Sequence, residues 1–384
     1  MTAIELKKNT SDSYRLKAKT KYDFTIVFLQ LMVLLASILI INNAHAIVYI
    51  DKDRPAGNGT SWANAYNSIE AAIAGTGENQ EFWVAEGTYT PSSDNPVIFG
   101  TRFAPKQGSQ FYGGFAGNET SRDQRDVSAY LTIIDANTNN LKHVIWIKIS
   151  TTNVRIDGFI IENGSATVDD GGWGKWGGGI FADQVTGTGY NTTLANCTFT
   201  NNTATESGGA VFINRRITAI ENCIFQTNTS KTGGALAGYD ADLTISDSTF
   251  NSNQANLGST TEQRGGAIWT IYQTPVIQKS TFSGNSAGHL GGAIEFNQPQ
   301  SATVSECEFS NNQTLNATGG GGAIAGMWDG VSEKPSVTVT GSSFVNNTSL
   351  LEGGGVYSYY CHMLIQDSRF QESAACINGQ ICGR

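Results

Sequence analysis

The chain has 384 residues, of which 44 are glycine, 7 are proline and only 15% are charged. An apolar content of 39% excludes a disordered or collagen-like polymer, and the abundance of glycine, asparagine and threonine disfavours a helix bundle. A formal net charge of −9 disfavours binding to phosphate backbones or anionic lipid surfaces, so we expect no nucleic-acid partner.

Residues 1–46 have the features of a signal peptide. A lysine-rich leader precedes an uncharged, mostly apolar run at 24–41, and Ala44-His45-Ala46 then supplies the small-x-small pattern of a cleavage site. The run is long enough that an uncleaved membrane anchor is the alternative. We expect cleavage, an extracellular or outer-surface location, no membrane insertion of the mature chain, and an environment that permits disulfides.

Residues 47–160 predict short apolar strands and one helix. The strands are expected at 47–50, 82–85, 131–134 and 143–147. The helix is expected from Ser68 to Ala74, with Ile69, Ala72 and Ile73 on one stripe, and it would cap the open end of the first coil. No linker or low-complexity stretch divides 47–384, so we predict one domain, with N-terminal coils and cap in 47–160 and repeat coils in 161–384.

From residue 194 onward two short signatures alternate. One is Phe-x-x-Asn and the other is Gly-Gly-small-aliphatic; an earlier Gly177-Gly178-Gly179-Ile180 accompanies a looser Phe159–Asn163 pair. Successive signature phenylalanines lie 25 to 35 residues apart, which is typical of a solenoid coil with a constant core and elastic loops. The phenylalanines are Phe199, Phe225, Phe250, Phe282, Phe309, Phe344 and Phe370.

The rest of the repeat favours strands. An aliphatic residue stands five positions before each phenylalanine, and Cys or Ser stands two before it, so a period of two puts this small residue and the ring on one buried face. Asparagine suits a corner because it tolerates left-handed backbone, and stacked copies would form a ladder. We therefore predict an all-β parallel solenoid with one phenylalanine buried in each coil.

The alternating signatures resemble those of the polymorphic outer membrane protein family, whose passengers are right-handed parallel β-helices. The stretches Val48-Tyr49-Ile50-Asp51 and Tyr112-Gly113-Gly114-Phe115 are similar to the start of secreted pectin-lyase-like proteins. The resemblance covers about half the chain. It implies a right-handed parallel β-helix, surface display and adhesion, although the last copy has Ser373 where the family pattern expects asparagine.

An outward-facing stripe is the first candidate site. The residue that follows each Gly-Gly-small-aliphatic motif should point outward, as should the residue two positions further on. Many are aromatic, which suits stacking against sugar rings or a partner protein; the alternative is that loops from neighbouring coils cover the stripe. With two tryptophans of a nearby insertion, the predicted binding residues are Trp173, Trp176, Phe181, Phe212, Tyr239, Trp269, Tyr357 and Tyr359.

The insertion at 164–176 is the second candidate, because tryptophan beside carboxylates fits a glycan site. A polysaccharide lyase would need a base, for which Lys175 is a candidate, and a glycosidase would need two facing carboxylates, for which Asp169 and Asp170 are candidates. The alternative is a glycine-rich surface loop with solvated charges, so no catalytic residue is assigned.

Other polar residues give weaker signals. Asp51, Asp53, Asp240 and Asp242 could bind Ca²⁺, but their spacing is not specific, so we expect no cofactor and no metal site. Arg264 and His289 directly precede or flank Gly-Gly pairs and are expected to be solvated corner residues.

The cysteines divide into two groups. Cys197, Cys223 and Cys307 occupy the inward small-residue column and are expected to be buried free thiols, with a Cys197–Cys223 bridge as the alternative. Cys376 and Cys382 are predicted to form a disulfide that closes the last coil.

Two functional hypotheses follow. The first is an adhesin-like binding module whose partner is a polysaccharide or a surface protein; it requires an open aromatic strip. The second is a polysaccharide-active enzyme, a lyase or a glycosidase. It requires Asp169, Asp170 or Lys175 to meet a titratable side chain from a neighbouring coil.

Overall fold

The computed structural model describes residues 46–381 except 92–103, 137–142, 149–150, 169–173, 184–190, 260–261, 317, 329–334, 351, 374 and 378–379; of 375–377 and 380–381 it describes the backbone alone. The chain divides at Ala46 into two units, and the described residues belong to the second, Ala46–Arg384. The expected signal peptide therefore lies outside the described residues except for Ala46. None of the helices in the described part is long and apolar enough to cross a membrane.

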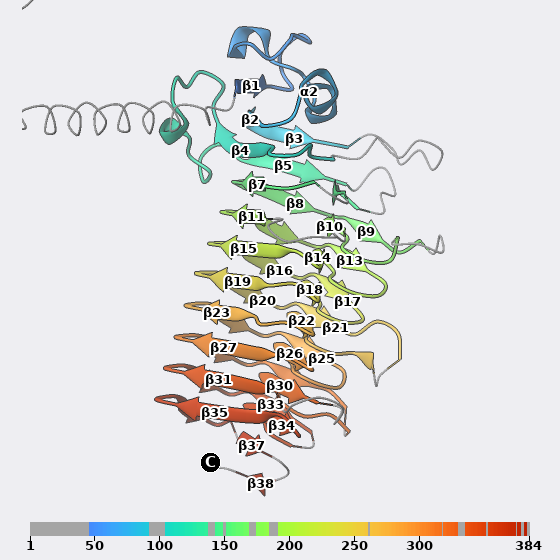
Figure 1. Ribbon diagram of the computed structural model, residues 1–384, viewed down its shortest axis with the longest axis vertical. Helices are drawn as coiled ribbons and strands as arrows, with labels where there is room; N and C mark the ends of the chain where they lie inside the picture. The colour runs from blue at the N-terminus through green and yellow to red at the C-terminus, as the bar shows by residue number, and fades with distance from the viewer. Residues whose placement is uncertain are drawn as a thin grey trace, which may run out of the picture. The chain divides into compact units, whose positions relative to one another are not determined.

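The second unit is a parallel β-helix, as predicted, and each coil adds strands to up to four parallel sheets (Figure 1). Sheet A comprises β1 (Ala46–Ile50), β2 (Gln80–Ala85), β4 (Gln110–Phe115), β7 (Val154–Asp157), β11 (Asn191–Ala195), β15 (Ile217–Glu221), β19 (Leu243–Ser246), β23 (Val276–Gln278), β27 (Ser301–Ser305), β31 (Ser336–Thr340) and β35 (His362–Gln366). Sheet B comprises β3 (Gly87–Tyr89), β5 (Thr132–Asp135), β8 (Phe159–Glu162), β12 (Thr198–Thr200), β16 (Ile224–Gln226), β20 (Thr249–Asn251), β24 (Thr281–Ser283), β28 (Glu308–Ser310), β32 (Ser343–Val345) and β36 (Arg369–Gln371).

Sheets C and D complete the coil. Sheet C comprises β6 (Ile145–Ile147), β10 (Ile180–Ala182), β14 (Val211–Asn214), β18 (Leu236–Tyr239), β22 (Ile268–Ile271), β26 (Ile294–Asn297), β30 (Ile324–Met327), β34 (Val356–Tyr359), β37 (Ala375–Ile377) and β38 (Gln380–Ile381), the last pair being antiparallel. Sheet D comprises β9 (Ser165–Ala166), β13 (Thr203–Ala204), β17 (Thr229–Ser230), β21 (Gln254–Ala255), β25 (Ser286–Ala287), β29 (Gln313–Thr314) and β33 (Thr348–Ser349).

The first coil is capped by the predicted helix. The helix α2 (Ile69–Gly75) follows Ser68, whose Oγ accepts a hydrogen bond from the Ala71 amide at 3.1 Å. Its buried side chains are Ile69, Ala72 and Ile73, which join the main apolar core. Figure 1 shows α2 beside β1, so the helix covers the first coil as expected. Two short 3₁₀ helices, η2 (Trp62–Asn64) and η3 (Arg122–Gln124), lie in the same N-terminal region.

The signature phenylalanines form a continuous stack inside the coils. Neighbouring rings from Phe199 to Phe370 lie 4.5–4.8 Å apart between centroids and within 8° of parallel. The expected earlier member is wrong, because Ile161 and not Phe159 is the register partner of Phe199. The spacing equals the separation of hydrogen-bonded strands, so each ring packs on the next without any slip in register.

The signature asparagines form the predicted ladder. Asn228 donates from Nδ2 to Asn253 Oδ1 at 3.0 Å and to the Phe199 carbonyl at 3.0 Å, and its backbone amide also donates to Asn253 Oδ1. Asn202, Asn253, Asn285 and Asn312 repeat this arrangement. Ser373 replaces the last asparagine, yet its Oγ still accepts from the Asn347 amide at 2.8 Å. The ladder therefore continues through the copy in which the signature decays.

The left-handed backbone lies one residue earlier than expected. Asn201, Thr227, Ser252 and Asn311, each directly before a ladder asparagine, have φ of 53–55°, whereas none of the ladder asparagines has positive φ. The ladder asparagine is fixed by its side-chain hydrogen bonds, so the preceding residue takes the strained conformation that the corner requires.

The inward Ser/Cys column behaves as predicted. Cys197, Cys223 and Cys307 are buried free thiols, and the Cys223 amide donates to Ser248 Oγ of the next coil at 3.1 Å. Burial raises the pKa of the Cys307 thiol to about 11, which makes it unreactive. Cys382 lies outside the described residues, and only the backbone of Cys376 is described, so their disulfide stays a prediction.

Candidate functional site

The outward face of sheet C carries two adjoining columns of side chains. The outer column follows the aliphatic residue of each motif, in register along the sheet: Trp146, Phe181, Phe212, Ala237, Trp269, Glu295, Ala325 and Tyr357. The corner column directly precedes the first glycine of each motif, and parallel bridges join its members: Trp176, Ser207, Thr232, Arg264, Leu290, Gly320 and Glu352. A corner side chain contacts the outer residue of the next coil, as Trp176 contacts Phe212.

The first part of the outer column is covered. Phe181 and Phe212 point away from the coil core into a separate apolar cluster, and they are 0% and 4% exposed. The His143 ring stacks on Phe181 at 4.9 Å, and the Trp176 ring lies 6.0 Å from Phe212. Both phenylalanines therefore face outward as predicted, but they are wrong as stacking residues for a ligand. In this part of the stripe, side chains from neighbouring segments cover the outward-facing residues, which was the alternative expectation.

The middle of the outer column holds a buried ion pair. Glu295 is 0% exposed, and its Oε1 lies 3.2 Å from Arg264 Nη1, whose side chain is 27% exposed. Burial raises the pKa of Glu295 to about 7, although Arg264 opposes the shift. The expectation that Arg264 is a solvated corner residue is wrong, because Arg264 is the corner side chain that covers Glu295.

Three polar atoms around this pair have no hydrogen-bond partner within the part of the chain that the structure describes. They are Glu295 Oε2, Trp269 Nε1 and His289 Nδ1. Trp269 is the register neighbour of Glu295, and His289 is close enough to Arg264 for that charge to lower its pKa, after the larger effect of burial. His289 Nε2 contacts the Thr318 carbonyl at 3.0 Å, so His289 is also half-buried rather than a solvated corner residue.

A second group of charges lies on the same corner, one coil earlier. Lys231 pairs with Glu206 and lies 3.7 Å from Glu262, whose side chain is 57% exposed. Lys175, the predicted base, precedes Trp176 at the start of this corner and is half-buried. Asp169, Asp170 and Trp173 lie outside the described residues, so the proposed catalytic set stays a prediction.

Several exposed tyrosine side chains lie at the carboxyl ends of strands in sheet C. We call Tyr239, Tyr272, Tyr359 and Tyr360 the tyrosine edge; they are 36%, 41%, 44% and 57% exposed. The rings of Tyr239 and Tyr272 meet edge-to-face at 6.0 Å, and those of Tyr359 and Tyr360 at 4.5 Å. Tyr239 and Tyr359 were predicted as binding residues. Tyr272 and Tyr360 were missed because each occupies the left-handed corner position after its strand.

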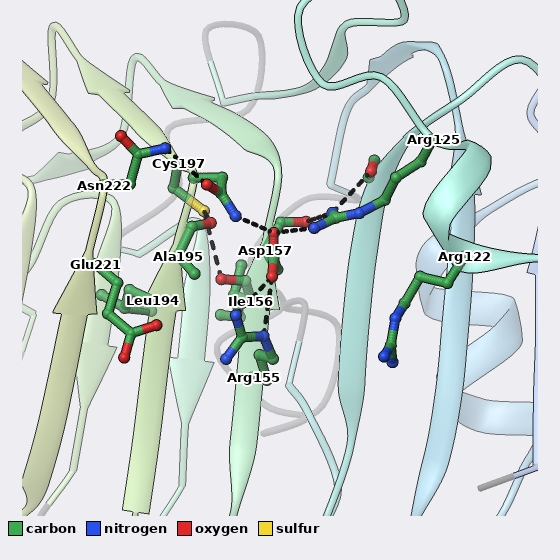
Figure 2. A network of polar contacts seen from close by, with 12 residues as sticks. Arg122, Arg125, Arg155, Ile156, Asp157, Leu194, Ala195, Cys197, Glu221 and Asn222 are labelled. Carbon is green, nitrogen blue, oxygen red and sulfur yellow. Dashed lines mark hydrogen bonds and ion pairs between the residues drawn. The ribbon is translucent and has the colours of Figure 1, made fainter.

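Another polar network lies on sheet A and is complete within the protein. Figure 2 shows Arg125 and Arg155 approaching Asp157 from two sides. The distances are 2.6 Å from Arg125 Nη2 to Oδ1 and 2.8 Å from Arg155 Nη2 to Oδ2, and Asn196 Nδ2 donates to Oδ1 at 2.8 Å. Asp157 is 2% exposed. This network ties the segment that follows η3 to sheet A, and we assign it a structural role.

Two of the four aspartates considered for calcium have arginine partners. Asp51 accepts from the Asp53 amide at 3.0 Å and from Arg54 Nε at 3.1 Å, and Asp240 pairs with Arg215 at 3.2 Å. Within the described ranges, no group of three or more His, Cys, Asp or Glu side chains is placed to hold a metal ion.

Stacked parallel coils with an outer column on one sheet define a protein of the right-handed parallel β-helix class. The family described as the right handed beta helix region matches residues 178–379, more than half of the chain, and the chain belongs to this family.

Solved structures similar to the chain include the following two. Pectin methylesterase from Aspergillus niger is 11% identical, with a TM-score of 0.39, over 87% of this chain and 86% of that one. The A-module of the mannuronan C-5 epimerase AlgE4 from Azotobacter vinelandii is 12% identical, with a TM-score of 0.32, over 84% of this chain and 95% of that one. Likeness at this level carries no argument about activity. No curated protein matches the chain.

Proposed function

We propose that the protein is an exported binding module that contacts a glycan through its tyrosine edge. The observation that carries the proposal is the exposure of four tyrosine side chains at the carboxyl ends of strands in sheet C. From Tyr239 to Tyr359 the edge spans four coil steps, or about 19 Å at the spacing of hydrogen-bonded strands. The two tyrosine pairs lie toward the ends of this span, with Asn297 and Met327 at the register positions between them. An extended polymer can contact both pairs, because tyrosine offers an apolar face together with a polar hydroxyl.

The surroundings of the edge favour a polar ligand. Arg215 lies over the Tyr239 ring, 5.8 Å from its centroid, and pairs with Asp240 at 3.2 Å. A polar rim around aromatic faces is typical of sites that orient a hydroxylated ligand. A large apolar protein interface would instead need a wider apolar patch.

Export and display belong to the same proposal. We infer that 1–46 is a cleaved signal peptide, that 47–384 is one β-helix domain, and that the rod is exposed outside the cell. The resemblance of the repeat to that of the polymorphic outer membrane proteins supports display at the cell surface, with a polysaccharide or a surface protein as the partner.

Affinity electrophoresis through gels that contain neutral or acidic polysaccharides tests the binding. Tyr272→Ala with Tyr360→Ala removes two exposed rings; at about 1 kcal/mol for each stacking contact, we expect roughly 30-fold weaker retardation. Leu315→Ala is the matched control, since this 47% exposed side chain lies off the edge. Equal retardation of all three proteins would refute a role for the edge.

The buried Glu295 favours a second candidate function, a polysaccharide-active enzyme. A carboxyl with a pKa of about 7 suits proton transfer at neutral pH, and Arg264 suits neutralisation of a uronate. Incubation with acidic polysaccharides, followed at the ultraviolet absorbance of a new C4–C5 double bond, tests for a lyase. If Lys175→Ala abolishes product formation, the active site lies at the insertion at 164–176. If Glu295→Gln abolishes it, the active site lies at the corner that holds Arg264 and Glu295.

A further inference from the structure

The corner around Arg264 combines a partly exposed cation with a buried carboxylate. The Arg264 side chain is 27% exposed, and the Glu295 side chain behind it is 0% exposed. One face of the guanidinium therefore borders solvent, while Nη1 lies 3.2 Å from Glu295 Oε1. An external anion and Glu295 would compete for this cation.

The same corner has unused hydrogen-bonding capacity. Within the described residues, Glu295 Oε2, Trp269 Nε1 and His289 Nδ1 lack partners, although these atoms are buried. Native proteins leave few buried polar atoms unpaired, and such atoms gather where a water or a ligand binds. Trp269 additionally offers a half-buried indole ring beside Glu295.

We propose that this corner binds the carboxylate or sulfate groups of an acidic polysaccharide, with Arg264 exchanging Glu295 for the ligand and Glu295 taking up a proton as it is released. Trp269 packs against the sugar ring, and its Nε1 donates to a ligand oxygen. The inference rests on the proposed glycan-binding function and names the class of glycan.

The charges that face the corner set its pH dependence. Lys231, one coil before Arg264, pairs with Glu206 and lies 3.7 Å from Glu262. Burial and Arg264 lower the pKa of His289 from 6.5, so it is neutral above that pH. Glu295, whose pKa burial raises to about 7, is the group at this corner on which the expected pH dependence rests.

The expected size of the effect follows from two-state competition. With a pKa of about 7 for Glu295, the neutral fraction falls from about 90% at pH 6 to about 10% at pH 8. If the ligand binds only the form with neutral Glu295, its affinity falls about tenfold over this range. Reciprocally, binding at pH 7 takes up about half a proton.

Binding of polygalacturonate, dextran sulfate and neutral dextran at pH 6 and pH 8 tests the proposal, with calorimetry in two buffers to measure proton uptake. We expect the wild-type protein to bind one or both acidic polymers about tenfold more weakly at pH 8; the two polymers separate carboxylate from sulfate recognition. Glu295→Gln should bind equally at both pH values, and Arg264→Gln should lose binding to the acidic polymer. Lys279→Gln, which removes an exposed positive charge on another corner, is the matched control.

Each outcome has a definite consequence. Wild-type binding that is independent of pH, or a Glu295→Gln protein that keeps the wild-type pH dependence, overturns this inference and leaves the tyrosine edge intact. Absence of binding to every polysaccharide overturns both proposals. If Arg264→Gln fails to fold by circular dichroism, Arg264→Lys keeps the charge without the planar fork, and unchanged affinity and pH dependence in that variant would also count against the site.

Discussion

Asn253 lies in the middle of the asparagine ladder, and its replacement by alanine is a sharp test of what holds the coils together. Its Oδ1 accepts from both the amide and Nδ2 of Asn228 at 3.0 Å, and its Nδ2 donates to the Phe225 carbonyl at 2.9 Å and to Asn285 Oδ1 at 3.0 Å. The variant keeps the backbone and the stacked rings but removes all four of these hydrogen bonds.

The expected loss of stability follows from the groups left behind. Asn285 Oδ1 keeps the Asn253 amide as a donor and the Phe225 carbonyl keeps its neighbours in the β16–β20 ladder, whereas the Asn228 amide and one Nδ2 hydrogen of Asn228 lose their acceptor in a site that is 0% exposed. An orphaned buried polar group costs about 1–3 kcal/mol, so with two such groups we expect Asn253→Ala to lower the free energy of unfolding by roughly 2–6 kcal/mol. This is a large part of the stability of an ordinary domain.

Urea unfolding followed by circular dichroism measures the change, and amide hydrogen exchange locates it. Asn251→Ala is the matched control, because this asparagine is half-buried on the outward face two residues earlier; we expect a change within about 0.5 kcal/mol. Exchange should accelerate first in the coils next to Asn253, since a solenoid couples nearest neighbours. An Asn253→Ala protein as stable as the control would show that the ladder follows from the fold without stabilising it.

Three further predictions concern glycine, Glu295 and a thiol. In Gly234→Ala the new Cβ would meet the Gly266 carbonyl oxygen at 2.2 Å, so we expect at least about 2 kcal/mol of destabilisation in urea, against little change in Gly77→Ala, where no atom lies within 4 Å. Glu295 binds a proton more tightly in the folded state (pKa about 7) than in the unfolded state (4.5). The stability that this group contributes is therefore complete below pH 4.5, and about 3 kcal/mol of it is lost as the pH rises to about 7. The difference in melting temperature between the wild-type protein and Glu295→Gln should show this pH dependence. Burial raises the pKa of Cys223 well above 9.0, so Ellman's reagent should label it only after unfolding, and rapid labelling of the native protein would contradict its placement.

The stacked part of the fold was predictable because each coil carries its own markers. A phenylalanine and an asparagine, such as Phe250 and Asn253, recur in the same order before and after each insertion. The register of the strands could therefore be inferred from the sequence alone. The prediction failed in the coil before Phe199, where a phenylalanine stands near the signature position but not at it. Phe159 is followed by an asparagine four residues later instead of three, and the buried Ile161 fills the ring position beside Phe199.

The site was predictable only in outline. That Phe181 points outward follows from strand periodicity, but its cover, the His143 ring, comes from 38 residues earlier in a coil without signatures. The contact between Arg264 and Glu295 joins neighbouring coils across 31 residues. One signal could have found it: Glu295 is the sole carboxylate in an outer column of aromatic and small side chains within the described coils, and a charge there needs a cation from the adjoining corner.

The variable lengths of the coils have a practical consequence. Extra residues enter between sheets D and C, as at 256–263, or between sheets C and A, as at 328–335, while the phenylalanine and asparagine ladders keep an unbroken spacing beside them. Segments inserted at these two positions of the chain can thus be exchanged, lengthened or grafted while the stacked layers keep their contacts.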